Sequence, residues 1–297
     1  MSSAVAAQGG VESRRLQIVP LLRSTGASLV VLGLLWAAWE AYKWVGESTG
    51  IEWPFEVNER TMPHIHEMVG QLFEPSRRNG PLLIDVLLDA ALFTGREAAA
   101  GFALGAVVGF AIAVCLAESR LLQRGFLPYI IASQTIPILA IAPMVVVWVN
   151  PRLPESLAGW GAVAVIAAYL TFFPVVINTL RGLTSADPRA VELMRSYAAG
   201  RWAILWKLRV PASMPYLFTA LKISAPAAVV GAIIGELPSS IQDGLAGAIL
   251  NFNQYYVTSP PSLWATNIIA ALLGVAFFAV VAVAERLFVR RAPENVA

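Results

Sequence analysis

The 297-residue sequence has little charge, one cysteine and two histidines. Charged residues make up 13% of the chain, against roughly 25% in an ordinary soluble domain. The single cysteine, Cys115, excludes an internal disulfide and any cysteine-rich metal site. The net charge of +2 is too small to indicate a nucleic-acid partner. Because 57% of the residues are hydrophobic and several apolar runs are long enough to cross a bilayer, the sequence predicts an integral membrane protein.

The sequence also lacks the motifs of an enzyme: it has no Walker loop, no Gly-x-Ser-x-Gly and no histidine cluster. His64 and His66, at i and i+2 of a helix, would point to different sides, and no clustered carboxylates complete a site, so we expect no metal. An ion-coupled secondary transporter remains the alternative class. Such a protein typically shows inverted repeats and ionisable residues at mid-membrane, and the sequence shows neither clearly.

Six apolar segments predict an all-α, polytopic membrane protein. The third is interrupted by Pro128, Pro137 and Pro143, and a bilayer tolerates such a break only where protein or a watery cavity covers it. The polar start of the chain is followed by no cleavage site, so we expect a retained first span. The expected spans are about 25–46, 91–117, 125–149, 157–180, 216–236 and 263–287, within a transmembrane domain 25–290 between an N-terminal segment 1–24 and a tail 291–297.

The distribution of lysine and arginine predicts the orientation. With both termini in the cytoplasm, fifteen of the 21 basic residues fall in cytoplasmic segments, as the positive-inside rule requires. The outer loop 47–90 is then long and rather acidic. Met68, Leu72 and Phe73 give part of it an amphipathic helical pattern, so we expect that part to lie along the membrane surface. Glu40 and Lys43, three residues apart, are expected to pair or to snorkel.

The cytoplasmic loop 183–215 is more elaborate than a connector needs to be. Asp187 followed by Pro188 is a good helix start, with an N-cap and a proline at the first helical position. A basic, amphipathic stretch runs on to Arg209, and Pro211 and Pro215 are expected to break the helix before span five. The pattern predicts a helix–turn–helix in the cytoplasm.

This loop resembles the ATPase-docking motif of bacterial ABC importer permeases: Glu-Ala-Ala, three residues, Gly, nine residues, then Ile-x-Leu-Pro. Glu192 opens the motif here and Pro211 stands 19 residues later. Leu193 and Met194 replace the two alanines, and Ala198 replaces the glycine. We expect Glu192 to cap or ion-pair within the loop and Gly200 to supply some flexibility. The resemblance implies that the coupling residues are Glu192, Arg195, Ala198, Gly200, Arg201 and Pro211.

The resemblance extends over residues 60–290. Segments 101–105, 134–143, 173–178 and 235–236 are similar to the permeases of sulfonate, nitrate, taurine and pyrimidine-precursor importers. It implies six helices of type I importer architecture and a bacterial inner-membrane location. The implied partners are a second permease copy, two ATPase subunits that bind ATP and Mg, and a periplasmic or lipid-anchored solute-binding protein. No cofactor is expected on this chain. The substrate stays open among sulfonates, taurine, nitrate, pyrimidine or riboflavin-like compounds and aromatic acids.

The translocation pathway has weaker signals. The broken third span could line a cavity, because freed carbonyls need polar company, or could simply be kinked. Carboxylates in the turn-rich end of span five could form an outer gate or a docking surface, or could be satisfied or solvated. The glycines of span two are expected to serve helix packing. The pathway candidates are Gln134, Thr135, Pro137, Pro143, Glu236 and Asp243.

Overall fold

The computed structural model describes residues 26, 30–31, 33–50, 57–77 and 79–289. The predicted segments 1–24 and 291–297 lie outside these residues. Over the described part every regular element is a helix, apart from one isolated β-bridge between Pro75 and Leu82. The chain forms two compact units, residues 1–71 and 72–297. The all-α prediction is confirmed for the described residues.

The first unit contains a helix over residues 33–49 and the short helix α2 (Ile65–Gln71). The described part of the predicted first span is therefore helical, and its beginning lies outside the described residues. Lys43 and Glu40 do not pair with each other. The buried Lys43 ammonium lies 2.9 Å from Glu59 and 3.7 Å from Glu47, whereas Glu40 pairs with a histidine.

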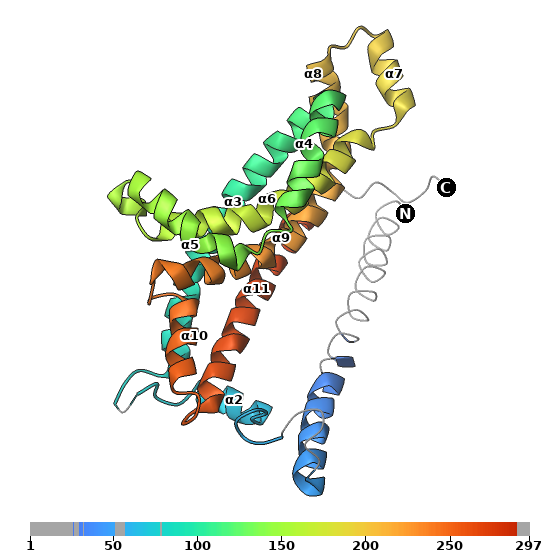
Figure 1. Cartoon of the computed structure of the whole chain (residues 1–297). Coiled ribbons are helices and arrows are strands. Elements are labelled where there is room, and N and C mark those ends of the chain that lie inside the picture. The colour runs from blue at the N-terminus through green and yellow to red at the C-terminus, as the bar shows by residue number, and fades with distance from the viewer. Residues whose placement is uncertain (1–25, 27–29, 32, 51–56, 78, 290–297) are drawn as a thin grey trace, which may run out of the picture. The chain divides into compact units, whose positions relative to one another are not determined.

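The second unit is a bundle of long apolar helices (Figure 1). Among the described residues, four helical runs are long and apolar enough to cross a membrane, or five if a bent pair counts as one. The predicted six is therefore not reached in the described part. The four are α3 (Leu83–Glu118), α6 (Trp160–Thr184), the run Arg201–Ser239 and α11 (Pro260–Phe288). Because α3 begins eight residues before the predicted span two, the outer loop is shorter than the expected 47–90.

The interface between α3 and α6 is built on small residues. A Cβ at Gly101 would lie 2.5 Å from the Ala164 carbonyl oxygen, and one at Gly105 would lie 2.6 Å from that of Ala168. A Cβ at Gly109 would lie 2.8 Å from the Phe172 carbonyl oxygen. No side chain fits at such separations, so the two helix backbones lie in direct contact, which confirms the predicted small-residue packing of span two.

The third predicted span is two helices, α4 (Arg120–Ser133) and α5 (Ile138–Val149), bent by 102°. Pro137 is the N-cap of α5, and Pro128 and Pro143 lie inside α4 and α5. Two short 3-10 turns, η1 (Asn150–Arg152) and η2 (Glu155–Leu157), lead on to α6. The predicted break is confirmed, and the single stretch 125–149 is wrong in its start, since α4 begins at Arg120.

The prediction that Pro211 breaks the helix is wrong. α8 (Arg201–Ile204), a π-helical turn η3 (Leu205–Arg209) and α9 (Val210–Ser239) follow one another without interruption. A proline lacks the N–H group and crowds the carbonyl of the residue four positions earlier. The wider π turn lies where that conflict would fall, so the chain continues as a helix through Pro211.

Candidate functional site

The loop after α6 carries a separate helix, α7 (Pro188–Ser196), which projects from one end of the bundle (Figure 1). The Asp187 side chain accepts a hydrogen bond of 2.9 Å from the Arg189 N–H group and caps the helix, with Pro188 at the first position. These two residues do what the sequence predicts of them. Residues 197–200 then turn the chain into α8, so the predicted helix–turn–helix is present.

The end of α7 is a Schellman motif centred on Ala198. The Ala199 N–H group donates to the Met194 carbonyl at 3.0 Å, and the Ala198 N–H group donates to the Arg195 carbonyl at 2.9 Å. Ala198 has φ of 55°, the left-handed conformation that this motif requires at its penultimate position and that glycine adopts most easily. The geometry explains why a glycine stands here in the motif that the loop resembles, and it places backbone strain at Ala198.

Gly200 does not use the conformational freedom of glycine. Its φ of −68° and ψ of 161° suit any residue, and a Cβ there would meet open space. The flexibility expected of Gly200 therefore stays a prediction, since this backbone conformation does not itself require glycine.

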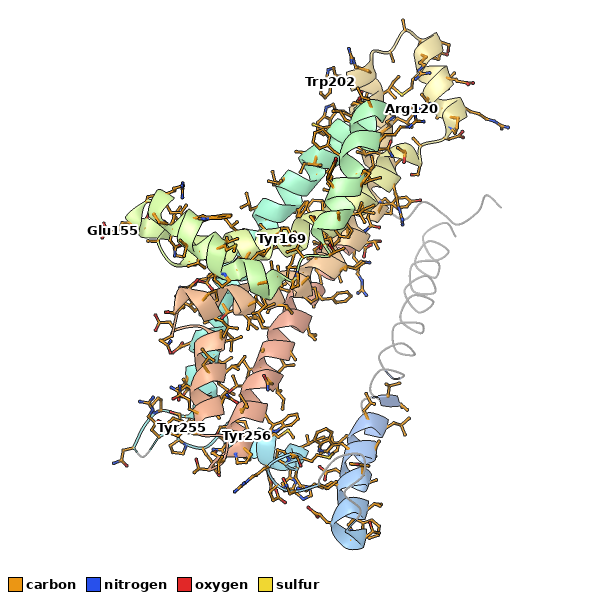
Figure 2. All side chains as sticks on the ribbon, viewed as in Figure 1. Arg120, Glu155, Tyr169, Trp202, Tyr255 and Tyr256 are labelled. Carbon is orange, nitrogen blue, oxygen red and sulfur yellow. The ribbon has the colours of Figure 1, made fainter. Side chains whose placement is uncertain are left out.

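The α7–α8 hairpin exposes both charge and large apolar side chains. Glu192, Arg195 and Arg201 are exposed. Glu192 forms no ion pair within the described part of the chain, so the ion-pair alternative of the two expected for it is absent there. Leu193 and Trp202 are 59% and 62% exposed. Figure 2 shows Trp202 and Arg120 at one end of the second unit, with Glu155 far along the bundle. Exposed aromatic and arginine side chains together are typical of a protein–protein interface.

A second constellation lies buried where α3, α9 and α10 (Leu245–Gln254) meet. The Thr94 hydroxyl donates to Glu236 Oε1 at 2.5 Å, and the Ala246 N–H group donates to Glu236 Oε2 at 2.8 Å. The Leu245 N–H group donates to the Thr94 hydroxyl at 2.8 Å. Gly244, the N-cap of α10, offers no side chain, so Glu236 and Thr94 satisfy the first N–H groups of this helix instead.

Gly244 allows the close approach that this arrangement needs. A Cβ at Gly244 would lie 2.3 Å from Glu236 Oε1, so only glycine leaves room for the carboxylate. Glu236 itself is fully buried. The predicted pathway residue is therefore a satisfied carboxylate that positions α10, which is one of the alternatives that the sequence left open.

Glu97, one turn after Thr94, lies beside this cluster and was missed by the sequence analysis. It is 2% exposed, and neither carboxylate oxygen has a hydrogen-bond partner of normal geometry among the described residues. Glu97 is therefore a buried ionisable residue within the long apolar helix α3. The signal was a glutamate inside the apolar run 91–117, which is costly in a bilayer unless it has a role.

The other pathway candidates do not join this cluster. Gln134 is half-buried at the end of α4, and Thr135, Pro137 and Pro143 are exposed at or beyond the bend. The Tyr169 hydroxyl of α6 donates to the Ser133 carbonyl and so provides one polar partner at the break. Asp243 is exposed and makes none of the contacts of Glu236.

The comparisons agree on the family. The model of the binding-protein-dependent transport system inner membrane component matches residues 102–291, so the chain belongs to this family. Its relatives are permeases of ABC import systems, and the chain is a multi-pass membrane permease of this kind.

Three relatives are named for the transport of different solutes. The formylaminopyrimidine transport permease ThiX of Halalkalibacterium halodurans is 33% identical over 189 residues, 63% of this chain and 71% of that protein. The riboflavin transport permease RibX of Chloroflexus aurantiacus is 29% identical over 59% of this chain and 61% of its own length. The nitrate import permease NrtB of a Synechocystis species is 25% identical over 65% of each chain. The last two are thus matched over less than two thirds of their own lengths.

A solved structure supports the fold. A chain described as part of an amino acid ABC transporter with histidines superposes with a TM-score of 0.54 at 14% identity. The match covers 69% of this chain and 95% of that one. At this identity the likeness concerns the helix arrangement alone.

Proposed function

We propose that this chain is the permease subunit of an ATP-driven, binding-protein-dependent importer for a small organic solute. The single observation that carries this proposal is the projecting α7–α8 hairpin, in a chain whose family consists of transport-system components. A capped helix that projects beyond the bundle and exposes charged and aromatic side chains suits a separate motor subunit better than it suits a connector.

In this proposal ATP and Mg bind to two partner ATPase subunits, each of which contacts one hairpin. Glu192, Arg195 and Arg201 supply exposed charge to that contact. Ala198 lies at the end of α7, and Gly200 is the N-cap of α8. Pro211 lies in the helix that leads from the contact into the membrane. Both termini face the cytoplasm, the membrane is the bacterial inner membrane, and a periplasmic or lipid-anchored binding protein delivers the solute.

A second copy of the chain completes the pore. α11 exposes a long apolar surface, with Val275 and Val280 more than 60% exposed. An apolar hollow of about 410 Å³ lies between α9 and α11 and includes Val230, Ile233 and Gly274 in its wall. Lipid covers part of such a surface, and a homodimer contact covers the rest.

We assign the bend between α4 and α5 to the lining of the pore. Backbone groups that lose their helical hydrogen bonds at the bend, and the side chains of Gln134 and Thr135, need water or other polar groups as partners. Asp243 belongs to the outer surface, where the binding protein docks. The named relatives transport a formylaminopyrimidine, riboflavin or nitrate, and the ring compounds carried by the first two are the solute class to screen first.

Co-purification tests the proposal. A tagged chain expressed with its partner ATPase is expected to retain that ATPase, and Glu192→Lys is expected to reduce the retained amount about tenfold, equivalent to about 1.4 kcal/mol. Glu155→Lys is the matched control, because Glu155 is also exposed but precedes the start of α6, at the opposite end of that helix from α7. Solute uptake by the chain alone in ATPase-free vesicles, driven by an ion gradient, would instead establish the secondary transporter.

A further inference from the structure

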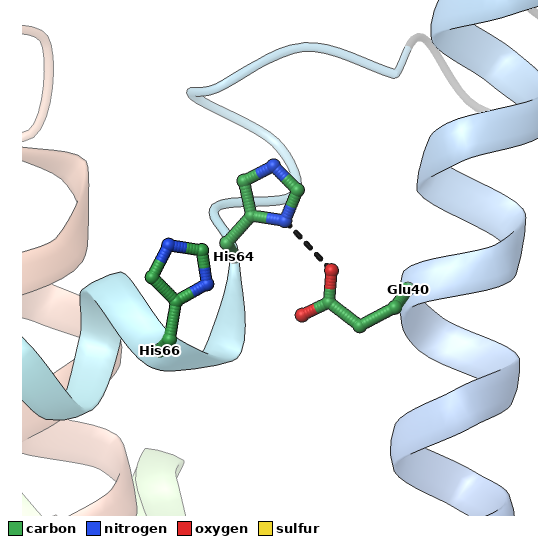
Figure 3. A group of neighbouring side chains, drawn as sticks. All are labelled: Glu40, His64 and His66. Atoms are coloured by element: carbon green, nitrogen blue, oxygen red, sulfur yellow. Dashed lines mark hydrogen bonds and ion pairs between the residues drawn. The ribbon is translucent and has the colours of Figure 1, made fainter.

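Both histidines of the sequence lie in one place, around Glu40 (Figure 3). His64 precedes α2 and His66 lies in its first turn, while Glu40 belongs to the helix 33–49. Because His64 is outside the helix, the two imidazoles do not diverge: their ring centroids are 5.1 Å apart and their planes are tilted by 32°. The premise that an i, i+2 spacing separates these side chains is therefore wrong.

The carboxylate of Glu40 completes the group. His64 Nδ1 lies 2.7 Å from Glu40 Oε2, and the Ile65 N–H group donates to Glu40 Oε1 at 3.2 Å. One ligand atom from each of Glu40, His64 and His66 lies within 4.8 Å of the other two. In a tetrahedral zinc site with bonds of about 2.0–2.1 Å, ligand atoms stand about 3.3 Å apart. His66 is exposed, so its side chain has room to move toward the other two ligands.

The donor set selects the class of ion. Two imidazole nitrogens with one carboxylate oxygen suit zinc, nickel or copper, whereas magnesium and calcium prefer oxygen ligands throughout. Three protein ligands leave a fourth position for water, the arrangement of an open zinc site. The Glu67 carboxylate accepts a hydrogen bond from the His64 backbone N–H group at 3.2 Å and helps to fix the position of that residue.

Two neighbouring carboxylates, those of Glu47 and Glu59, add negative charge near the three ligands but are bound by a lysine. Glu47 and Glu59 form an overlapping group with His64. Both are already held by the Lys43 ammonium, at 3.7 Å and 2.9 Å. Glu40, by contrast, faces the two imidazoles and no lysine or arginine in the ion pairs of the described residues. The three residues thus stand apart from the lysine-bound acids as a ligand set.

We propose that Glu40, His64 and His66 bind a divalent transition-metal ion of the zinc class. The ion joins the helix 33–49 to the beginning of α2 within the first unit. In its absence the same link rests on the hydrogen bonds of Glu40 to His64 and to the Ile65 N–H group. The site is independent of the coupling hairpin and of the transported solute.

Calorimetric titration of the full-length permease with Zn²⁺ tests this. The protein is purified through a tag that contains no histidine, stripped with a chelator and returned to detergent micelles. The expected result is one Zn²⁺ per chain, with binding weakened at least tenfold in His66→Ala and in Glu40→Gln. His66→Ala removes an exposed side chain, and Glu40→Gln keeps an acceptor for the Ile65 N–H group, so both variants are expected to fold. Circular dichroism verifies this.

Two controls separate the site from other ligands. Cys115→Ser removes the exposed thiol and is expected to leave zinc binding unchanged. Titration with Mg²⁺ is expected to give no signal. The proposal is overturned if the wild-type chain binds no Zn²⁺, if His66→Ala binds as tightly as wild type, or if Cys115→Ser abolishes binding. In those cases Glu40 and His64 form only a hydrogen-bonded pair, and His66 takes no part in binding.

Discussion

Thr94 and Glu236 are 142 residues apart in the sequence, and their side chains share a buried hydrogen bond of 2.5 Å. Together they hold the first N–H groups of α10, so that helix depends on contributions from both α3 and α9. This dependence makes α10 sensitive to single substitutions far from it in sequence.

Glu236→Leu is expected to destabilise the permease by about 2 kcal/mol or more, since it leaves buried N–H and hydroxyl groups without partners. Glu97→Gln is the matched control. Glu97 has no hydrogen bond of normal geometry to lose among the described residues, and an amide of the same shape cannot carry a buried charge, so stability is expected to stay equal or rise. Thermal unfolding of the two variants in detergent measures the difference. Equal losses would show that Glu236 is not the capping group.

Ala198→Gly is expected to stabilise the end of α7 by about 1 kcal/mol, because it relieves a left-handed conformation at a residue with a Cβ. Hydrogen exchange of the Ala199 amide, which donates to Met194, should slow about fivefold. Gly200→Ala, at an ordinary φ and in open space, should leave α7 unchanged. Faster exchange in Ala198→Gly would contradict the Schellman geometry.

Gly101→Ala is expected to cost about 1–3 kcal/mol by overpacking the α3–α6 interface, where its Cβ would lie 2.4 Å from that of Ala167. Gly95→Ala tests the same helix at a site where the nearest atom is 3.5 Å away, and it should be tolerated. Yield of folded protein and unfolding temperature distinguish the two. If both glycines tolerate alanine equally, the helices are not in direct backbone contact.

The hydrogen bond from Lys43 holds the pKa of Glu59 below its ordinary value of 4.5. A carboxyl with a lowered pKa in the folded state contributes stability that is fully present above 4.5 and is lost as the pH falls through the lowered value. The difference in unfolding temperature between wild type and Glu59→Gln should therefore shrink on acidification below 4.5. The effect is expected to be small, because the Glu59 side chain is 62% exposed. A difference that grows on acidification would reverse the assignment.

Much of the architecture could be predicted from hydrophobic runs and helix signals. Asp187 and Pro188 marked the start of α7 correctly, and the glycines of span two marked a close interface. These features are local or depend on one face of one helix. The long helix through Pro211 could not be read in this way, because the π turn that accommodates the proline depends on packing rather than on the proline itself.

The clusters were harder to predict for a related reason. Glu236 caps a helix that begins nine residues later, with the help of a threonine from α3, and Glu40 meets histidines 24 and 26 residues away. The sequence around each of these residues carries no local pattern that indicates its distant contact. Only the folded chain shows that a carboxylate in a span is satisfied by a distant N–H group, or that two imidazoles face the same acid.

The uninterrupted run from Arg201 to Ser239 has a mechanical consequence. At 1.5 Å per residue its 39 residues extend about 58 Å. One end carries the exposed Trp202, and the other carries Glu236, which accepts a hydrogen bond from the first turn of α10. Because the run is one continuous helix, a displacement of its exposed end is expected to reach the Glu236 carboxylate and, through the hydrogen bond to the Ala246 N–H group, the start of α10.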